Sequence, residues 1–187
     1  MQIEFIEETH TYLVDGVIVP SVTQIMKPMS EQYYNGLPEE VLKQAANRGT
    51  RVHKAIYDFE QLNAVLVDDT MPYFKNYLVA KNIKKFKPLM QEFALTEGTF
   101  CGTLDMLAEM DGQQVIIDLK VTSKLNKELA EVQLAGYVEL CEKNGIGVNG
   151  TYILHLTKDS FKLHQITPNF DKWKELKDES MRTMRGK

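Results

Sequence analysis

Cysteine is scarce in this sequence, and long apolar segments are missing from it. The two cysteines among its 187 residues, Cys101 and Cys141, lie far apart and form no C-x-x-C motif. We therefore expect two inert, partly buried thiols, and neither a disulfide framework nor an iron-sulfur cluster. No run approaches the roughly 18 apolar residues of a membrane span, and the acidic N-terminus lacks the apolar segment of a secretion signal. These absences predict a cytoplasmic protein without a membrane partner.

An excess of basic charge is also absent, since the formal net charge is -4. A negative total argues against a partner with a phosphate backbone. One segment differs, because no acid occurs between Asp69 and Glu92 while lysines and aromatic residues are interleaved there. The lysines of this segment are Lys75, Lys81, Lys84, Lys85 and Lys87. Such a run is typical of the solvated face of a helix, and it also suits a groove that follows a nucleic-acid strand.

The length and ordinary composition predict one domain, residues 1–187. Within it we distinguish residues 1–90 with N-terminal strands and helices, a core over 91–166, and a C-terminal helix over 167–187. The core has a pattern of three antiparallel strands, a helix over about 127–143, and two further strands. We therefore expect an α/β protein of the α+β type. Its central mixed sheet would be flanked by helices, with an N-terminal β-hairpin and helical region.

The helices of the N-terminal part are predicted from their end signals. Ser21 is a plausible N-cap for a brief helix, and Pro38 fits the first turn of a second one. Gly49 is expected to interrupt that second helix, which restarts and reaches about Leu62. Residues 70–86 give a weaker helical pattern that carries the lysines.

The stretch V-I-I-D-L-K-V-T-S, residues 115–123, places an acid and a base inside an apolar strand. The preceding Asp111-Gly112 is a strong signal for a two-residue hairpin turn. That turn sets a register in which Asp105 lies directly opposite Asp118, on the same face as Lys120. The other face would be apolar, with Leu104, Met106, Ala108, Met110, Val115, Ile117, Leu119 and Val121.

Two opposed carboxylates destabilise a sheet, because directly facing Cβ atoms are about 4.5 to 5.5 Å apart. A hard divalent cation such as Mg²⁺ or Mn²⁺ between Asp105 and Asp118 would make the pair favourable. Lys120 would then reach the water or the phosphate at that ion. Two alternatives stay open: Lys120 neutralises Asp118 in a structural ion pair, or a bulge shifts the register.

Two other segments carry polar residues that are candidates for the same site. Gln133 and Tyr137 are four residues apart, so they project from one side of their predicted helix. His53 lies close to the apolar stripe of an earlier helix. A single histidine in that position is typical of a core or boundary residue, and it is also a candidate ligand.

Four motifs, taken in order, resemble those of the RecB-like branch of the PD-(D/E)xK nuclease superfamily, which includes phage-type exonucleases. They are R-G-T-R-V-H (48–53), G-T-L-D (102–105), D-L-K (118–120) and Q-L-A-G-Y (133–137). The segment P-S-V-T-Q-I-M (20–26) is similar to N-terminal segments of phage-type members. The resemblance implies a restriction-endonuclease-like core.

The resemblance also implies roles for single residues. His53, Asp105 and Asp118 would be metal ligands, with the backbone carbonyl of Leu119 as a fourth. Lys120 would be the catalytic lysine. Gln133 and Tyr137 would contact DNA or steady the site, and Glu92 stands where related nucleases often carry an acid.

The activity implied is that of a DNA exonuclease that depends on Mg²⁺ or Mn²⁺ and leaves 5′-phosphate and 3′-hydroxyl ends. It would serve phage or mobile-element recombination and repair, with the lysines of segment 75–87 gripping the strand. A recombination or single-strand-annealing protein, or a helicase, would be a separate polypeptide. Two alternatives stay open: a non-catalytic DNA-binding or assembly subunit that retains the fold, and a domain with coincidental motifs, whose aspartates would lie on different faces.

Overall fold

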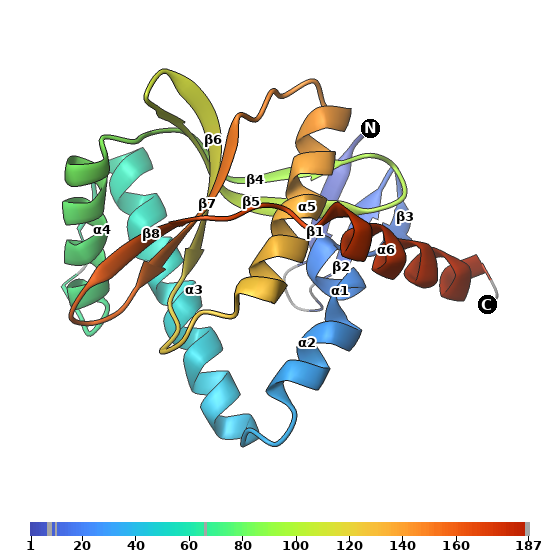
Figure 1. Cartoon of the computed structure of the whole chain (residues 1–187), viewed down its shortest axis with the longest axis horizontal. Helices are drawn as coiled ribbons and strands as arrows, with labels where there is room; N and C mark the ends of the chain where they lie inside the picture. Colours follow the sequence, from blue (N-terminus) through green and yellow to red (C-terminus); the bar gives the residue numbers. More distant parts are fainter. Residues whose placement is uncertain (7–8, 10, 66, 186–187) are drawn as a thin grey trace.

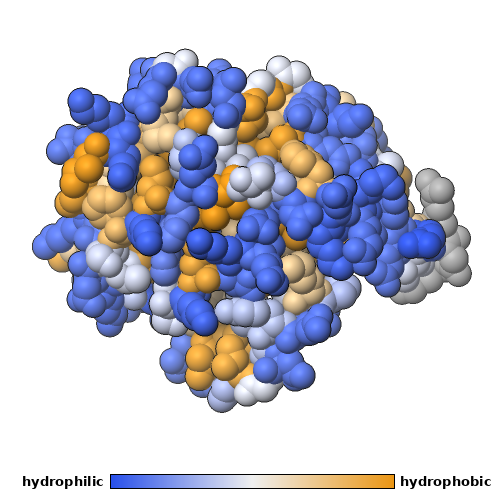
Figure 2. Space-filling model, in the orientation of Figure 1, coloured by the Kyte–Doolittle hydropathy of each residue, from blue (hydrophilic) through white to orange (hydrophobic). Residues whose placement is uncertain are grey.

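The fold combines two β-sheets with helices. The computed structural model describes residues 1–6, 9, 11–65 and 67–185, and these form a three-stranded sheet, a five-stranded sheet and six helices. Figure 1 shows α5 (Lys127–Lys143) lying across the larger sheet, with α3 (Glu39–Leu62) and α4 (Met71–Lys84) at the opposite side of the molecule from α6 (Phe170–Arg185). Figure 2 shows, in the same orientation, a mostly hydrophilic surface over α6. The predicted α+β class, with a mixed sheet flanked by helices, is confirmed.

The N-terminal part begins with a small antiparallel sheet. Its strands are β1 (Ile3–Ile6), β2 (Thr11–Val14) and β3 (Val17–Val19). The short helix α1 (Val22–Ile25) follows and has the predicted cap, because the backbone N–H of Gln24 donates to Ser21 Oγ while Gln24 Oε1 accepts from the Ser21 N–H. This reciprocal pair satisfies two amide groups that a helix start leaves free.

Two helix predictions need correction. A helix that the sequence pattern did not indicate, α2 (Lys27–Tyr34), follows α1; it buries none of its residues, so it lacks the apolar stripe that such a prediction needs. The helix α3 is also continuous through Gly49. Glycine costs only about 1 kcal/mol in a helix interior, and burial of Val52 and Ile56 on the next turns outweighs that cost. None of the helices in the described ranges is long and apolar enough to cross a bilayer.

The five-stranded sheet carries the core. Its strands, in spatial order, are β4 (Lys87–Thr96), β5 (Cys101–Met110), β6 (Gln113–Lys120), β7 (Gly150–Leu156) and β8 (Phe161–Gln165). All neighbours are antiparallel except β6 and β7, which are parallel. A parallel pair requires a crossover, which α5 supplies.

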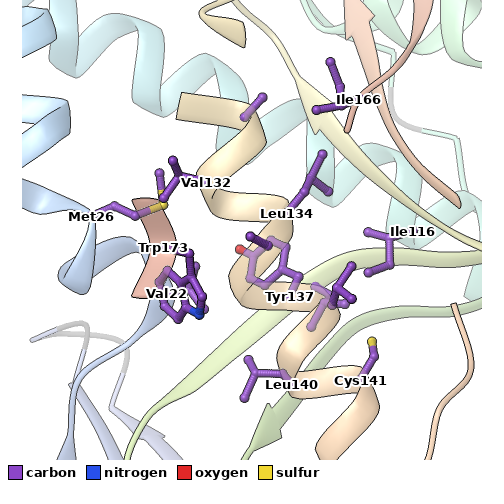
Figure 3. Close-up of a cluster of buried hydrophobic side chains, with 14 of the residues drawn as sticks. Val22, Met26, Ile116, Val132, Leu134, Tyr137, Leu140, Cys141, Ile166 and Trp173 are labelled. Atoms are coloured by element: carbon purple, nitrogen blue, oxygen red, sulfur yellow. The ribbon is translucent and has the colours of Figure 1, made fainter. Parts of the chain in front are cut away.

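Both faces of this sheet are buried. On one face α5 packs together with α1 and α6, and Figure 3 shows Trp173 and Val22 beside α5 in this cluster. The glycine at position 136 allows this close packing, since a Cβ there would lie only 2.9 Å from Val22 Cγ1 and 3.1 Å from the Trp173 ring. On the other face α3 and α4 cover β5, β6 and β7.

Both cysteines are free and fully buried, rather than partly buried as the sequence suggested. Burial raises the pKa of Cys101 to about 12 and that of Cys141 to about 11. Because the thiolate is the reactive form, these two thiols are inert.

Candidate active site

The hairpin of β5 and β6 positions the two candidate aspartates. The turn residues Asp111-Gly112 both have positive φ, 52° and 74°, and the predicted register is confirmed from the turn to the pair Leu107–Ile116. The backbone pairing ends there, so Asp105 and Asp118 do not form the directly opposed pair that the register predicts.

The side-chain alternation of β5 is interrupted at Asp105. Leu104 packs in the α5-face cluster and Met106 in the opposite one, whereas a regular strand would place both on one face. The prediction that Leu104 shares a face with Met106 is therefore wrong. Asp105 Oδ2 accepts a hydrogen bond from the backbone N–H of Leu119 at 2.6 Å, so this side chain takes the place of the missing backbone partner.

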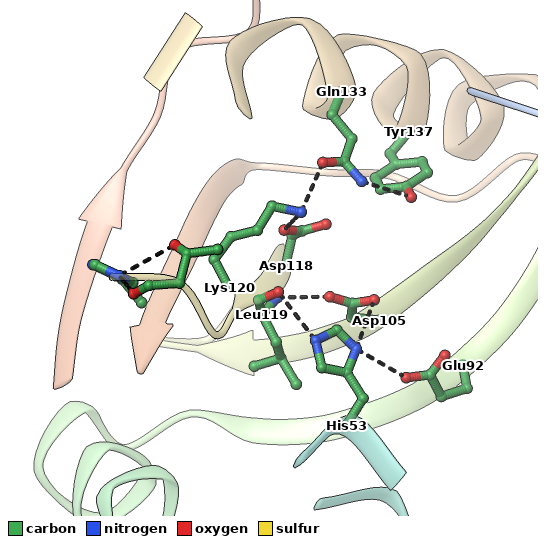
Figure 4. Close-up of polar contacts among 10 residues, drawn as sticks. His53, Glu92, Asp105, Asp118, Leu119, Lys120, Gln133 and Tyr137 are labelled. Carbon is green, nitrogen blue, oxygen red and sulfur yellow. Dashed lines mark hydrogen bonds and ion pairs between the residues drawn. The ribbon is translucent and has the colours of Figure 1, made fainter. Parts of the chain in front are cut away.

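Asp118 points in another direction. It is 1% exposed, and Figure 4 shows its carboxylate directed toward Gln133 and Tyr137 on α5, while Asp105 lies next to His53 and the backbone of Leu119. The directly facing pair that the register predicts is not observed. The aspartates still interact, because the charge of Asp105 helps to raise the pKa of Asp118.

His53 joins Asp105 from α3. Its Nε2 lies 3.2 Å from the carbonyl oxygen of Leu119, and because a carbonyl only accepts, this nitrogen carries the proton of that hydrogen bond. Its Nδ1 lies 3.5 Å from Asp105 Oδ1 and 3.6 Å from Glu92 Oε1. Burial alone would lower the pKa of His53, but the two carboxylates outweigh burial and raise it to about 10.

Glu92 completes this group through an unusual backbone conformation. It lies on β4 between the pairs Gln91–Met106 and Phe93–Leu104, which places it level with Asp105. Its φ is 45°, in the left-handed region that a residue with a side chain rarely adopts. The resemblance to RecB-like nucleases had marked Glu92 only as an additional acid, and nothing in the sequence signals the strained conformation that turns its carboxylate toward His53.

These three side chains suit a small divalent cation. His53, Glu92 and Asp105 each offer one atom, and the three atoms lie within 4.8 Å of one another. Around an octahedral ion with ligands at about 2.1 Å, neighbouring ligand atoms are about 3 Å apart and opposite ones about 4 Å apart. The separations of 3.5 and 3.6 Å fit that range. The group could therefore hold a metal ion, and its two carboxylates and one imidazole do not by themselves identify which one.

The predicted ligand set differs from this group at two positions. The Leu119 carbonyl is engaged by His53 Nε2, so it orients the ring and leaves Nδ1 for an ion, as backbone carbonyls commonly do for ligating histidines. The carboxylate of Asp118 is engaged by Lys120, with Nζ 2.7 Å from Oδ2. This contact is an ion pair within the core, where Asp118 is 1% exposed.

Lys120 is held at its ammonium end by α5. Its Nζ donates to Gln133 Oε1 at 2.8 Å, and Gln133 Nε2 donates in turn to the Tyr137 hydroxyl at 3.0 Å. The predicted pair on one side of α5 therefore does reach the strand that carries Asp118. Burial would lower the pKa of Lys120, but Asp118 and Asp105 outweigh it and raise that pKa, so the side chain is a fixed cation.

The two aspartates have opposite pKa shifts. Burial opposes the ionisation of Asp105, but the charges of His53 and Lys120 outweigh it and lower the pKa. Burial dominates for Asp118, and the nearby Asp105 adds to it, so the pKa of Asp118 is raised although Lys120 acts against the shift. Carboxylates whose pKa values are driven apart in one cluster are typical of functional sites.

The site is open to solvent on the side of α3. A hollow of about 330 Å³ is lined by Thr50, His53, Lys54, Tyr57 and Glu92. A second hollow of about 370 Å³ lies between α1, α2 and α6 and contains none of the site residues. His53 and Glu92 of the candidate metal group are thus reachable without opening the core.

The basic segment does not converge on this site. Lys81 is paired with Glu60 at 2.6 Å; Lys75 and Lys84 are exposed on α4, whereas Lys85 caps the helix and Lys87 belongs to β4. Because α4 packs on the sheet face opposite to α5, its lysines lie away from Lys120. Their predicted contact with DNA stays a prediction.

Comparisons with known proteins found similarity in structure only. No protein-family model matches the sequence, and no curated protein matches it either. Among solved structures, the one described as "Crystal structure of SSO0001" is similar with a TM-score of 0.49 and 14% sequence identity, covering 88% of this chain and 75% of that one. The functional proposal therefore depends on the geometry of the site itself.

Proposed function

We propose that the chain is a divalent-metal-dependent nuclease that hydrolyses phosphodiester bonds of DNA, as an exonuclease of phage or mobile-element recombination and repair. One observation carries the proposal: the atoms of His53, Glu92 and Asp105 that can bind a cation lie within 4.8 Å of one another. Beside them, the buried carboxylate of Asp118 pairs with the partly exposed Lys120, whose ammonium is held in place. The order of motifs that resembles RecB-like nucleases supports the same chemistry.

Mg²⁺ or Mn²⁺, when bound by His53, Glu92 and Asp105, would supply Lewis-acid chemistry and lower the pKa of water. The protein contributes orientation. The Leu119 N–H fixes one oxygen of Asp105, and its carbonyl fixes the ring of His53. The residues that face the ion therefore need little rearrangement when it binds.

Lys120 is suited to stabilise negative charge at phosphorus. In hydrolysis, a water oxygen forms a bond to phosphorus while the bond to the leaving oxygen breaks, and charge increases on the phosphate oxygens. A cation already positioned by Gln133 and Asp118 stabilises that charge without reorganisation. Its raised pKa makes Lys120 a charge partner or a proton donor, whereas the raised pKa of Asp118 allows that carboxyl to accept a proton near neutral pH.

The test compares buried and exposed versions of the same ion pair. Asp118→Asn and Lys120→Met keep the size of each side chain, and each is expected to lower cleavage of end-labelled single- or double-stranded DNA by at least about 100-fold. The controls are Asp178→Ala and Lys174→Ala, which remove an exposed pair of the same residue types on α6 and are expected to cleave like the wild type. Cleavage that persists in both site variants would overturn the proposal.

Metal binding separates the nuclease from its main alternative. Titration calorimetry with Mn²⁺ is expected to show one ion whose binding is lost in Asp105→Asn and weakened in Glu92→Gln. A wild-type protein that binds DNA but neither Mn²⁺ nor Mg²⁺ would instead be the non-catalytic DNA-binding or assembly subunit.

A further inference from the structure

A row of lysine and histidine side chains crosses the sheet from Lys120. In the register of β6, β7 and β8, Lys120 pairs with His155 and His155 pairs with Lys162. Paired residues of neighbouring strands point to the same face, so all three side chains lie on the face that α5 covers in part. Three strands at about 4.8 Å spacing give this row a span of about 10 Å.

Two further groups extend the row. The ring of His164 lies diagonally from that of His155, with centroids 6.3 Å apart. Lys127, the first residue of α5, is close enough to act on His164 together with Lys162 and His155. Burial is the largest cause that lowers the pKa of His164, and the other causes are the nearby Lys162, His155 and Lys127; no carboxylate acts on it.

Lys120 is paired with Asp118, but the two lysines at the other end of the row have no counter-charge among the described residues. Lys127 and Lys162 are exposed, and neither of them forms an ion pair or a side-chain hydrogen bond with a described residue. His155 is fixed by hydrogen bonding, since its Nε2 donates to the Thr122 carbonyl at 2.6 Å. Lys127 and Lys162 therefore present positive charge that no described residue neutralises, on the same sheet face as Lys120. An anionic group such as a backbone phosphate would neutralise it.

We propose that Lys162, Lys127, His155 and His164 bind backbone phosphates of the nucleic-acid strand whose cleaved phosphate lies at Lys120. The inference rests on the proposed nuclease function and assigns a path to its substrate. The strand then runs along the ends of β6, β7 and β8 beside the start of α5, rather than over the lysines of α4. The contact is with phosphates, so it carries no base sequence preference.

Binding measured without divalent metal tests the path separately from cleavage. Fluorescence anisotropy with labelled single- and double-stranded DNA of one length, in EDTA and over a series of salt concentrations, compares the wild type with Lys127→Ala/Lys162→Ala. The slope of log affinity against log salt is expected to become shallower by about 1 for each lysine removed. In cleavage assays the same variant is expected to show a raised KM with an unchanged kcat.

Lys143→Ala is the matched control, because Lys143 is an exposed lysine at the other end of α5. It is expected to keep the wild-type slope, and the unfolding temperature of every variant is checked first. An unchanged slope in the double variant, an equal loss in Lys143→Ala, or a loss seen only in Lys84→Ala/Lys85→Ala overturns the proposed path.

The outcomes distinguish this inference from the proposed function. A slope that depends on Lys127 and Lys162 in a protein that never cleaves DNA supports the path and overturns the nuclease. If cleavage requires Asp118 but the salt-dependence slope is the same with and without Lys127 and Lys162, the nuclease is supported and the path is overturned. A wild-type protein that binds neither form of DNA overturns both.

Discussion

Replacing Glu92 by alanine and by glycine separates the strain at this position from the function of its carboxylate. The φ of 45° places the residue in the left-handed region, which costs roughly 1–2 kcal/mol for a residue with a Cβ and nothing comparable for glycine. Against this, glycine gives the unfolded chain more conformational freedom than alanine does, which lowers the stability of the folded protein by about 0.5–1 kcal/mol. The net expectation is that Glu92→Gly is more stable than Glu92→Ala by about 0.5–1 kcal/mol.

This order is the reverse of the one expected in an ordinary strand. The neighbouring Gln91, also on β4, has no positive φ, so Gln91→Ala is expected to be more stable than Gln91→Gly. Each pair of variants removes the same side-chain contacts, and the difference within a pair therefore reports the backbone alone. Urea denaturation followed by circular dichroism measures all four proteins.

The same two Glu92 variants report on metal binding. Both lack the carboxylate, so both are expected to lose most of the rise in unfolding temperature that Mn²⁺ gives the wild type. For a chain of this length 1 kcal/mol corresponds to roughly 2–4 °C, which a thermal shift assay resolves. The reasoning is refuted if Glu92→Ala equals or exceeds Glu92→Gly in stability, or if Mn²⁺ stabilises both variants as it does the wild type.

Three shorter predictions follow from other contacts. Tyr137→Phe removes the hydroxyl that accepts the hydrogen bond of the Gln133 amide. Steady-state kinetics should show a several-fold lower kcat with an unchanged KM, whereas an equal change in kcat and KM would point to a general loss of packing. His53 is protonated below about pH 10 and must lose that proton to bind a cation. Mn²⁺ binding near neutral pH should therefore release about one proton, and the affinity should rise with pH. Calorimetry in buffers of different ionisation enthalpy measures the proton release, and binding heats that do not depend on the buffer would contradict the prediction. Gly136→Ala should destabilise by about 1–3 kcal/mol because its Cβ meets close neighbours, whereas Gly147→Ala, with nothing within 4 Å, should change stability by less than about 0.5 kcal/mol.

Local signals in the sequence were sufficient for the framework of the fold. Asp111-Gly112 predicted the β5–β6 register near the turn because both turn residues need positive φ, and α5 spans the predicted residues 127–143. The helix α2 was not found, because it buries no residue and so shows no periodic apolar stripe.

The sequence was sufficient to name residues of the candidate site but not to predict how they are arranged. His53 and Asp105 do come together, yet the interruption of β5 at Asp105 and the positive φ of Glu92 depend on how β4 and β5 pair, which no local pattern shows. The pairing of Asp118 with Lys120, held open as an alternative, is the arrangement that the structure contains. The row through His155 was missed, although the alternation of T-Y-I-L-H-L and F-K-L-H-Q-I places their polar residues on one face.

The backbone of Leu119 has a consequence for how this site tolerates mutation. Its N–H holds Asp105 and its carbonyl holds His53, while its side chain is buried against the cluster under α3 and α4. Exchange for another apolar residue keeps both contacts, so a scan of side chains would report position 119 as permissive. An amide-to-ester substitution that removes the N–H would expose its role. Repacking of the core beneath Leu119 would displace Asp105 and His53 together, because both contact the backbone of this one residue. A mutation in the interior can therefore alter the candidate metal group without touching its side chains.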